Sequence, residues 1–332
     1  MTTLKSLVDE TTNIKNEIVE CRDNLRQTLV EKGVECNSQD KMSNLIDKID
    51  NLKISYFPNW YKTRELYLPI GEFSDLAFSY SSSVIIDNLI YVRVNNKLVV
   101  YNADTNQIVE SISIPYTETT STPISVVDHV IYFIGANKVN GDKKCFKFDT
   151  KTKIFSLIST YDGKGRTDPV LVSVGKEIYI YGGIDWANGT TYSRCYNTLT
   201  DTYTTKPTIP STVYSTGGYL YNNKLYIPAY YAGYFEVFDI NTQAWLTRTS
   251  SNTQANTQTY LGGLCGNSDK IYIMGGRNNL KESCVYDISK DEWLRLEDMP
   301  VGREGLSLEF YNNNIYILCG TGTNLKNYCY VI

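Results

Sequence analysis

The chain has 332 residues, 42% of them hydrophobic, and a formal net charge of −4 at pH 7. That length is enough for a core and up to two domains. The Lys and Arg residues are scattered and form no basic stripe that would bind nucleic acid or anionic lipid. No apolar run is long enough for membrane insertion, and the first residues (MTTLKSLVDE) lack the order of a signal peptide. Synthesis in the cytoplasm is therefore expected.

The first predicted element is a long amphipathic helix. Residues 4 to 28 carry apolar or small residues at alternating steps of three and four, which is a heptad pattern. The predicted oligomerisation residues are Leu4, Leu7, Ile14, Ile18 and Leu25, with Thr11, Cys21 and Thr28 at the other seam positions. A homotrimer through these helices is expected. A dimer fits the same seam, and packing of the helices on the rest of the chain is the alternative.

A second, shorter helix is predicted from about Ser38 to Leu52, after a break at Gly33. Residues 1 to 52 are thus expected to form a helical coiled-coil segment that serves for attachment. Residues 53 to 332 have a different character and are expected to form the second domain.

The second domain contains a repeated strand. It reads EIYIYGG at 177 to 183 and KIYIMGG at 270 to 276. Its tyrosine recurs at positions 91, 132, 179, 226, 272 and 316, which are 41 to 47 residues apart. A period of this size indicates propeller blades or another repeat array, and the predominance of Tyr, Ile, Val and Thr favours strands over helices.

Each repeat predicts four strands. A turn-forming cluster precedes the repeated strand, a third strand ends in an aromatic residue and Asp or Asn (VYDISKDE), and a fourth follows (EWLRLEDMP). The Asp or Asn is expected to cap a tight turn through backbone hydrogen bonds. Four strands per repeat predict a mostly β, six-bladed β-propeller.

The ends of the domain are predicted to pair. The last repeat stops after its third strand, at NYCYVI, whereas residues 59 to 69 (NWYKTRELYLP) look like a fourth strand without the other three. Pairing of these two strands would close the ring and hide two sheet edges.

The repeats resemble the kelch repeat, in which an apolar strand ends in Gly-Gly and is followed by Tyr-Asp and then Trp. The match is good at 274–293 and partial at 181–203. Gly-Gly is replaced at 134–136, 228–230 and 319–321 by IGA, PAY and CGT. The resemblance implies a kelch-like propeller.

A second resemblance concerns the stretch LRQTLVEKGVECNSQDKMSNLIDKI at 25–49. It is similar to a segment near the N-terminus of tail-fibre and baseplate-attached proteins of phages and phage-like particles. There it joins an attachment region to a receptor-binding domain. The resemblance implies a location in a virion tail or tail-like particle, with other tail or baseplate proteins as partners.

Catalysis is not expected. The only histidine, His129, lies in a turn before a repeated strand, and the eight dispersed cysteines form no zinc spacing. The copper oxidases that share the kelch architecture are implied to need histidine ligands, and sialidase-type Asp boxes are absent. No cofactor, metal or catalytic residue is predicted. Paired carboxylates on a loop face keep a surface glycan hydrolase open as an alternative.

Binding is expected at the loops. GIDWANGTTYS carries Trp186, and AYYAGYF carries Tyr230, Tyr231 and Tyr234. Aromatic rings with polar tips suit sugars and peptides, although each of these side chains also fits a structural role.

Arginines are the other predicted binding residues. Arg166, Arg277 and Arg303 lie in loops that the kelch resemblance places on one face, so they are predicted to line a common rim. The alternative is that such an arginine binds loop carbonyls of an adjacent blade.

The function expected from these features is that of a non-enzymatic phage tail or tail-like component whose propeller head recognises a host surface glycan or protein. Several linked heads would strengthen weak individual binding. The alternative is a cytoplasmic kelch-type protein-interaction scaffold or adaptor whose helical segment docks another protein.

Overall fold

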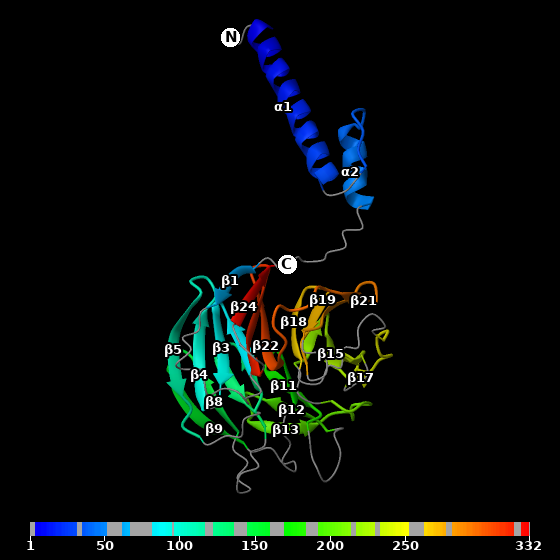
Figure 1. Cartoon of the computed structure of the whole chain (residues 1–332). Coiled ribbons are helices and arrows are strands. Elements are labelled where there is room, and N and C mark those ends of the chain that lie inside the picture. Colours follow the sequence, from blue (N-terminus) through cyan, green and yellow to red (C-terminus); the bar gives the residue numbers. More distant parts are fainter. Residues whose placement is uncertain are drawn as a thin grey trace. The chain divides into compact units, whose positions relative to one another are not determined.

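The computed structural model describes fourteen stretches of the chain, and its residues divide into two compact units, Met1–Phe57 and Pro58–Ile332. Figure 1 shows the helices and strands of both units. The described residues are 4–31, 35–51, 62–66, 82–94, 96–116, 122–135, 145–159, 169–183, 192–213, 217–229, 233–251, 262–276, 281–321 and 327–331.

The first unit contains two helices, α1 (Leu4–Glu31) and α2 (Met42–Asn51), which contact each other. Leu29 of α1 and Leu45 of α2 are buried. Burial of these two leucines accounts for the pairing of the helices, because removal of apolar side chains from water is the main favourable term. None of the described helices is long and apolar enough to cross a membrane.

Helix α2 begins four residues later than the predicted start at Ser38. The reason is a turn in front of it, in which the N–H of Asp40 donates to the carbonyl of Asn37 (3.2 Å) and the Asp40 carboxylate accepts from the N–H of Asn37 (2.9 Å). Lys48 of α2 donates to the same carboxylate and to the carbonyl of Glu35, both at 2.6 Å. The predicted break at Gly33 and the predicted end at Leu52 lie outside the described residues.

The predicted oligomerisation residues differ in their exposure. Ile14 and Ile18 are 51% and 56% exposed, whereas Leu25 is partly buried. Leu4 and Leu7 belong to α1, but their side chains lie outside the described part. The described helices show no coiled coil within this single chain, and association of copies through this face stays a prediction.

The second unit is built from antiparallel sheets. Its described strands form six four-stranded sheets, and in five of them the strands pair in chain order. These five sheets are β2–β5 (Ser82–Ile86, Leu89–Val94, Lys97–Asn102, Gln107–Ser113), β6–β9 (Ile124–Val127, Val130–Phe133, Cys145–Asp149, Ile154–Ile158), β10–β13 (Val170–Val174, Glu177–Tyr181, Ser193–Asn197, Thr202–Thr205), β14–β17 (Tyr219–Tyr221, Lys224–Pro228, Phe235–Asp239, Ala244–Trp245) and β18–β21 (Gly263–Asn267, Lys270–Met274, Ser283–Asp287, Glu292–Arg295).

The remaining sheet joins the two ends of the unit. Its order is β1-β24-β23-β22, with β1 at Lys62–Leu66, β22 at Glu304–Tyr311, β23 at Asn314–Thr321 and β24 at Asn327–Val331. In Figure 1 the blue β1 lies beside the red β24, and Leu66 pairs with Asn327 in this antiparallel ladder. The predicted pairing of the two end strands is confirmed.

The sheets surround a common axis. The first strands of neighbouring sheets contact each other in a closed cycle that runs through β2, β6, β10, β14, β18 and β22 and returns to β2. Cores between neighbouring sheets fill the space around this axis. The six repeated tyrosines are all buried in these cores. A mostly β propeller, as predicted from the repeats, is confirmed.

The predicted Asp or Asn turns are present after the third strands. The side-chain oxygen of Asp149, for example, accepts hydrogen bonds from the N–H groups two and three residues later, at 2.9 Å each. The residue that ends this turn has a positive φ, such as Lys153 at 60°. The same arrangement recurs at Asn102, Asn197, Asp239 and Asp287.

The glycine pairs fit a close approach between sheets. Gly275 has a φ of 70°, and a Cβ atom there would lie 2.6 Å from the carbonyl oxygen of Arg303. Gly276 donates its N–H to that oxygen (3.1 Å). Gly182 and Gly183 make the equivalent approach to Val213. Only glycine combines this backbone conformation with so little space.

Candidate functional site

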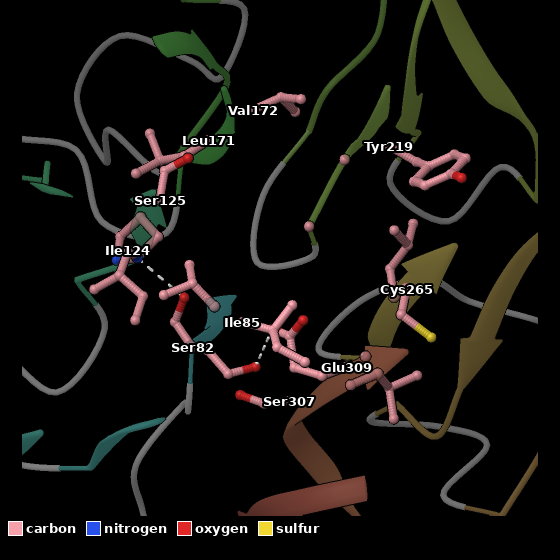
Figure 2. Close-up of a pocket in the computed structure, with 18 of the residues that line it drawn as sticks. Ser82, Ile85, Ile124, Ser125, Leu171, Val172, Tyr219, Cys265, Ser307 and Glu309 are labelled. Atoms are coloured by element: carbon pink, nitrogen blue, oxygen red, sulfur yellow. Dashed lines mark hydrogen bonds between the residues drawn. The ribbon is translucent and has the colours of Figure 1, made fainter. Parts of the chain in front are cut away.

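The described part of the propeller contains a central cavity of about 400 Å³. The first strands of all six sheets line it, and Figure 2 shows side chains from several of them around the opening. Small residues keep the centre open, because most of the lining consists of serine, glycine and short aliphatic side chains. Its volume falls within the roughly 300–1,000 Å³ that is usual for small-molecule sites.

One half of the cavity wall is polar. The hydroxyl of Ser82 accepts a hydrogen bond from the N–H of Ile124 (3.0 Å), which connects β2 with β6. The hydroxyls of Ser125 and Ser173 lie 2.6 Å apart and connect β6 with β10. Serine side chains therefore bridge successive inner strands on this side of the ring.

The other half of the wall is formed by glycines that approach apolar side chains. A Cβ atom at Gly218 would lie 2.6 Å from Val172, and one at Gly263 would lie 2.6 Å from Leu308. At Gly266 it would meet the ring of Tyr219, whose hydroxyl donates to the carbonyl of Ser268 (3.0 Å). Any larger residue at these glycines would have to displace a neighbouring side chain.

Glu309 supplies the carboxylate among the described lining residues. It lies in β22 and accepts a 2.7 Å hydrogen bond from the hydroxyl of Ser83 in β2. Burial raises the pKa of Glu309 to about 7, and the hydrogen bond from Ser83 lowers it by less. A carboxyl group with a strongly shifted pKa in a cavity is typical of functional sites, although structural groups show such shifts too.

Ser307 lies two residues before Glu309 on the same strand, so the two side chains share one face of the sheet. That face is directed toward β2, because Ser83 of β2 binds Glu309. Figure 2 shows Ser82, Ser307 and Glu309 gathered on one side of the pocket. Ser307 is 5% exposed, and its hydroxyl has no hydrogen-bond partner among the described residues. A buried hydroxyl of this kind is energetically unfavourable until something binds it.

The described cavity lining holds one carboxyl group and no cluster of metal ligands. Glycoside hydrolysis uses a pair of carboxyl groups, and the described lining residues include one, Glu309. Within the described residues no group of three His, Cys, Asp or Glu side chains is placed to hold a metal ion. The cavity offers hydroxyl groups, one carboxyl group and an apolar wall, a set that can hold a small molecule in one orientation.

Arg303 does not lie at a rim. Its side chain is fully buried, and its guanidinium group donates a 2.9 Å hydrogen bond to the carbonyl of Cys319. Its own carbonyl accepts from Gly276 of the preceding sheet. The predicted rim position is therefore wrong for Arg303, whose guanidinium group binds a carbonyl in β23 of its own sheet.

Tyr234 lies in a partly buried cluster next to β16. The guanidinium group of Arg248 lies 4.5 Å from the centre of its ring, and its hydroxyl lies 3.1 Å from that of Ser211. Ser211 also donates to the buried carboxylate of Glu236 (2.5 Å). These contacts fix the tyrosine ring beside the turn that contains Gly233.

The other predicted binding residues lie outside the described part of the chain. They are Trp186, Tyr230, Tyr231, Arg166 and Arg277. Their role in binding stays a prediction. His129 lies in the turn before β7, as predicted, with Nε2 3.5 Å from the Asp149 carboxylate.

Sequence reasoning missed the cavity residues Ser83, Ser307 and Glu309. A signal was present, because five of the six first strands carry serine or glycine, and in the sixth two glycines come directly before β14. The stretch SLEFYNN also places a glutamate within one of these otherwise weakly polar strands.

Comparison with known proteins supports a kelch-type β-propeller. The Kelch-like protein terF of Aspergillus terreus is 25% identical over 177 residues, which are 45% of this chain and 37% of that protein. The chain thus spans little more than a third of this relative. The solved structure of YjhT superposes with a TM-score of 0.63 at 10% identity and covers 76% of this chain and 93% of that chain. No protein-family profile matches the chain.

Proposed function

We propose that this chain is a non-enzymatic binding protein, a kelch-type protein-interaction scaffold or adaptor. In this proposal an end of the propeller binds a target protein through its loops, and the helical unit joins the chain to other copies or to a second protein. Trp186, Tyr230, Tyr231, Arg166 and Arg277 remain the proposed loop contacts.

The observation that carries the proposal is the combination of a kelch-type propeller with a separate helix whose Ile14 and Ile18 are about half exposed. The likeness to a Kelch-like protein supports the propeller as a binding module. Exposed isoleucines four residues apart on a helix form an apolar strip, which suits helix–helix association. Two distinct surfaces are what an adaptor needs.

Several described aspartates have a structural role in turns. Burial would raise the pKa of Asp291, but hydrogen bonds from Tyr286 and Ser250 outweigh it and lower the pKa. In Asp149 and Asp239 backbone N–H groups of their own turns lower the pKa. Carboxylates held in this way stabilise turns and are poor proton donors near neutral pH.

The test is binding of a purified partner to the full chain. Proteins labelled by proximity to the full chain in its native cell would be purified, and their affinity measured by calorimetry. Trp186→Ala or Tyr231→Ala should weaken binding at least tenfold without a change in melting temperature, because aromatic anchors carry much of interface energy. Leu199→Ala is the matched control, since Leu199 is 74% exposed on a turn after a third strand. Unchanged affinity in both variants would reject the proposed loop contacts.

A second candidate is a receptor-binding component of a phage tail or tail-like particle, with a homotrimer presenting the propellers to a host surface glycan or protein. The exposed strip at Ile14 and Ile18 favours this candidate, because an apolar strip on a helix suits association with further copies of the chain. Binding of fluorescent full chain to host cells, lost in an Ile14→Asp/Ile18→Asp variant, would support it. Recovery of intracellular partners with no cell-surface binding would favour the scaffold.

A further inference from the structure

The central cavity has features that the proposed scaffold role does not use. Ser83 holds the carboxyl group of Glu309 in place, but among the described residues no Lys, Arg or His contributes to the shift of its pKa. Buried carboxyl groups in proteins are normally paired with a cation or neutralised by a proton. A positive charge that enters the cavity would therefore be stabilised by Glu309.

The hydroxyl of Ser307 is available beside this carboxyl group. It is almost completely buried and lacks a hydrogen-bond partner in the described part of the chain, while it shares a strand face with Glu309. A hydroxyl group offers one donor and two acceptor sites. A group with several N–H donors could thus bind the carboxylate and the hydroxyl at the same time.

Another part of the cavity lining is apolar. Leu306 and Leu308 of β22 point away from the Ser307 face, because side chains alternate along a strand. They lie against Gly263 of β18, and Val172 lies against Gly218. Figure 2 shows Val172 and Tyr219 on the side of the pocket away from Ser307. A ligand would therefore meet polar groups at one end and hydrocarbon at the other.

We infer that the cavity binds a small amphipathic ammonium compound, with its charged nitrogen at Glu309 and Ser307 and its hydrocarbon part against the glycine-lined wall. An ammonium group has three N–H donors and no acceptor, so it matches a carboxylate and a hydroxyl oxygen. Charge-assisted hydrogen bonds in a buried site are about twice as strong as neutral ones. This inference concerns the propeller core and does not depend on the proposed protein partner.

The test uses the full chain and a series of n-alkylammonium ions from butyl to octyl, with binding measured by calorimetry. The matching primary alcohols are the neutral probes of nearly the same shape. We expect the ammonium ions to bind at least tenfold more tightly than the alcohols. Affinity should rise about fourfold with each added CH₂ until the cavity is filled.

Two variants locate the site. Glu309→Gln keeps the shape and removes the charge, so it should reduce ammonium affinity about tenfold or more and leave alcohol affinity within about threefold. Ser307→Ala should reduce ammonium affinity about fivefold. The controls are Glu292→Gln and Ser111→Ala, two exposed positions on outer strands, which should bind like the wild type.

Several results would overturn the inference. One is that no probe binds the wild type at millimolar concentration, which would mean that the cavity holds water alone. Others are equal affinities for ammonium ions and alcohols, or wild-type affinity in both Glu309→Gln and Ser307→Ala. Thermal melting of each variant shows whether it is folded. If Glu309→Gln does not fold, Ser307→Ala still tests the site.

Discussion

The hydroxyl of Tyr286 donates a 2.6 Å hydrogen bond to the carboxylate of Asp291, and the same carboxylate oxygen accepts a 2.9 Å bond from the backbone N–H of Ser250. Tyr286 belongs to β20 and Asp291 to the turn that follows, whereas Ser250 follows the last strand of the preceding sheet. One side chain thus connects two neighbouring sheets. The arrangement recurs at Asp201, whose carboxylate accepts from the hydroxyl of Tyr196 (2.7 Å) and from the backbone N–H of Ser159 (2.8 Å).

Removal of the Tyr286 hydroxyl should destabilise the propeller. We expect Tyr286→Phe to lower the free energy of unfolding by about 1–2 kcal/mol, because the Asp291 carboxylate loses a short hydrogen bond in a partly buried site. Urea unfolding followed by circular dichroism measures the change. Tyr196→Phe should behave alike, and a midpoint equal to that of the wild type in both variants would contradict the explanation.

Gly275 and Gly175 separate two effects of a positive φ. Both glycines have a left-handed backbone conformation. A Cβ atom at Gly275 would lie 2.6 Å from the carbonyl oxygen of Arg303, whereas a Cβ atom at Gly175 would have no neighbouring atom within 4 Å. Gly175→Ala should lower the free energy of unfolding by about 1 kcal/mol through backbone conformation. Gly275→Ala should lower it by at least about 2–3 kcal/mol. Similar losses in urea unfolding would show that the close approach to Arg303 has no energetic consequence.

Asp287 should make the free energy of unfolding decrease at acidic pH. Its burial would raise the pKa, but hydrogen bonds from Ser289 and Lys270 outweigh this and lower the pKa to about 2. A lowered pKa stabilises the fold above the unfolded value near 3.8, and this stabilisation is lost as pH falls toward 2. Asp287→Asn should therefore lose about 2 kcal/mol at pH 7, with a smaller difference from the wild type at pH 3. The control Asp87→Asn, in an exposed turn, should have the free energy of unfolding of the wild type at pH 7.

Glu309 should make the free energy of unfolding decrease as the pH rises, the opposite of the effect of Asp287. Its pKa is raised by burial to about 7 from 4.5, so the folded state holds a proton that the unfolded state has lost. Its stability contribution is complete below about pH 4.5 and declines as pH rises to 7. Cys265 of β18 interacts electrostatically with Glu309. We expect Glu309→Gln to be more stable than the wild type by about 1–2 kcal/mol at pH 8 and to lack this decline. Thermal melting from pH 5 to 8 is the measurement.

The exposed face of α1 predicts association of copies. Ile14→Asp together with Ile18→Asp should convert an oligomer of the full chain into monomers, because charges at seam positions oppose helix pairing. Mass in solution by light scattering decides the question. Cys21 is an exposed free cysteine at a seam position, so mild oxidation should cross-link wild-type chains through it. A monomeric wild type would reject self-association and leave a different protein as the partner of the helix.

The strand repeats were predictable because each one carries its own turn chemistry. Asp149 and Asp287 cap their turns as the sequence indicates, and the spacing of Tyr179 and Tyr272 reports the period directly. The start of α2 was not predictable in this way. The sequence before Met42 holds no helix breaker between Ser38 and Lys41, but the hydrogen bonds between Asn37 and Asp40 form a turn there instead of a helix.

The candidate site was less predictable than the fold. Arg303 looks like a loop arginine in sequence, but its side chain is fully buried at the approach of the preceding sheet, where Gly276 binds its carbonyl, and no local pattern encodes this contact. Glu309 meets Ser83 across more than two hundred residues of sequence. Only closure of the ring brings these residues together, so their proximity depends on the tertiary structure.

Because β1 pairs with β24, the propeller ring cannot close until the end of the chain has been synthesised. Strand β1 is made before any complete sheet of the propeller, and its partner is made after all of the others. At about 5–20 residues per second this interval is on the order of tens of seconds. Throughout it the hydrogen-bonding groups of β1 have no native strand to bind. A nascent β1 could instead pair with a finished β24 of another copy, which is a strand exchange between chains. Ring closure is therefore the folding step at which neighbouring ribosomes on one mRNA should give strand-swapped oligomers.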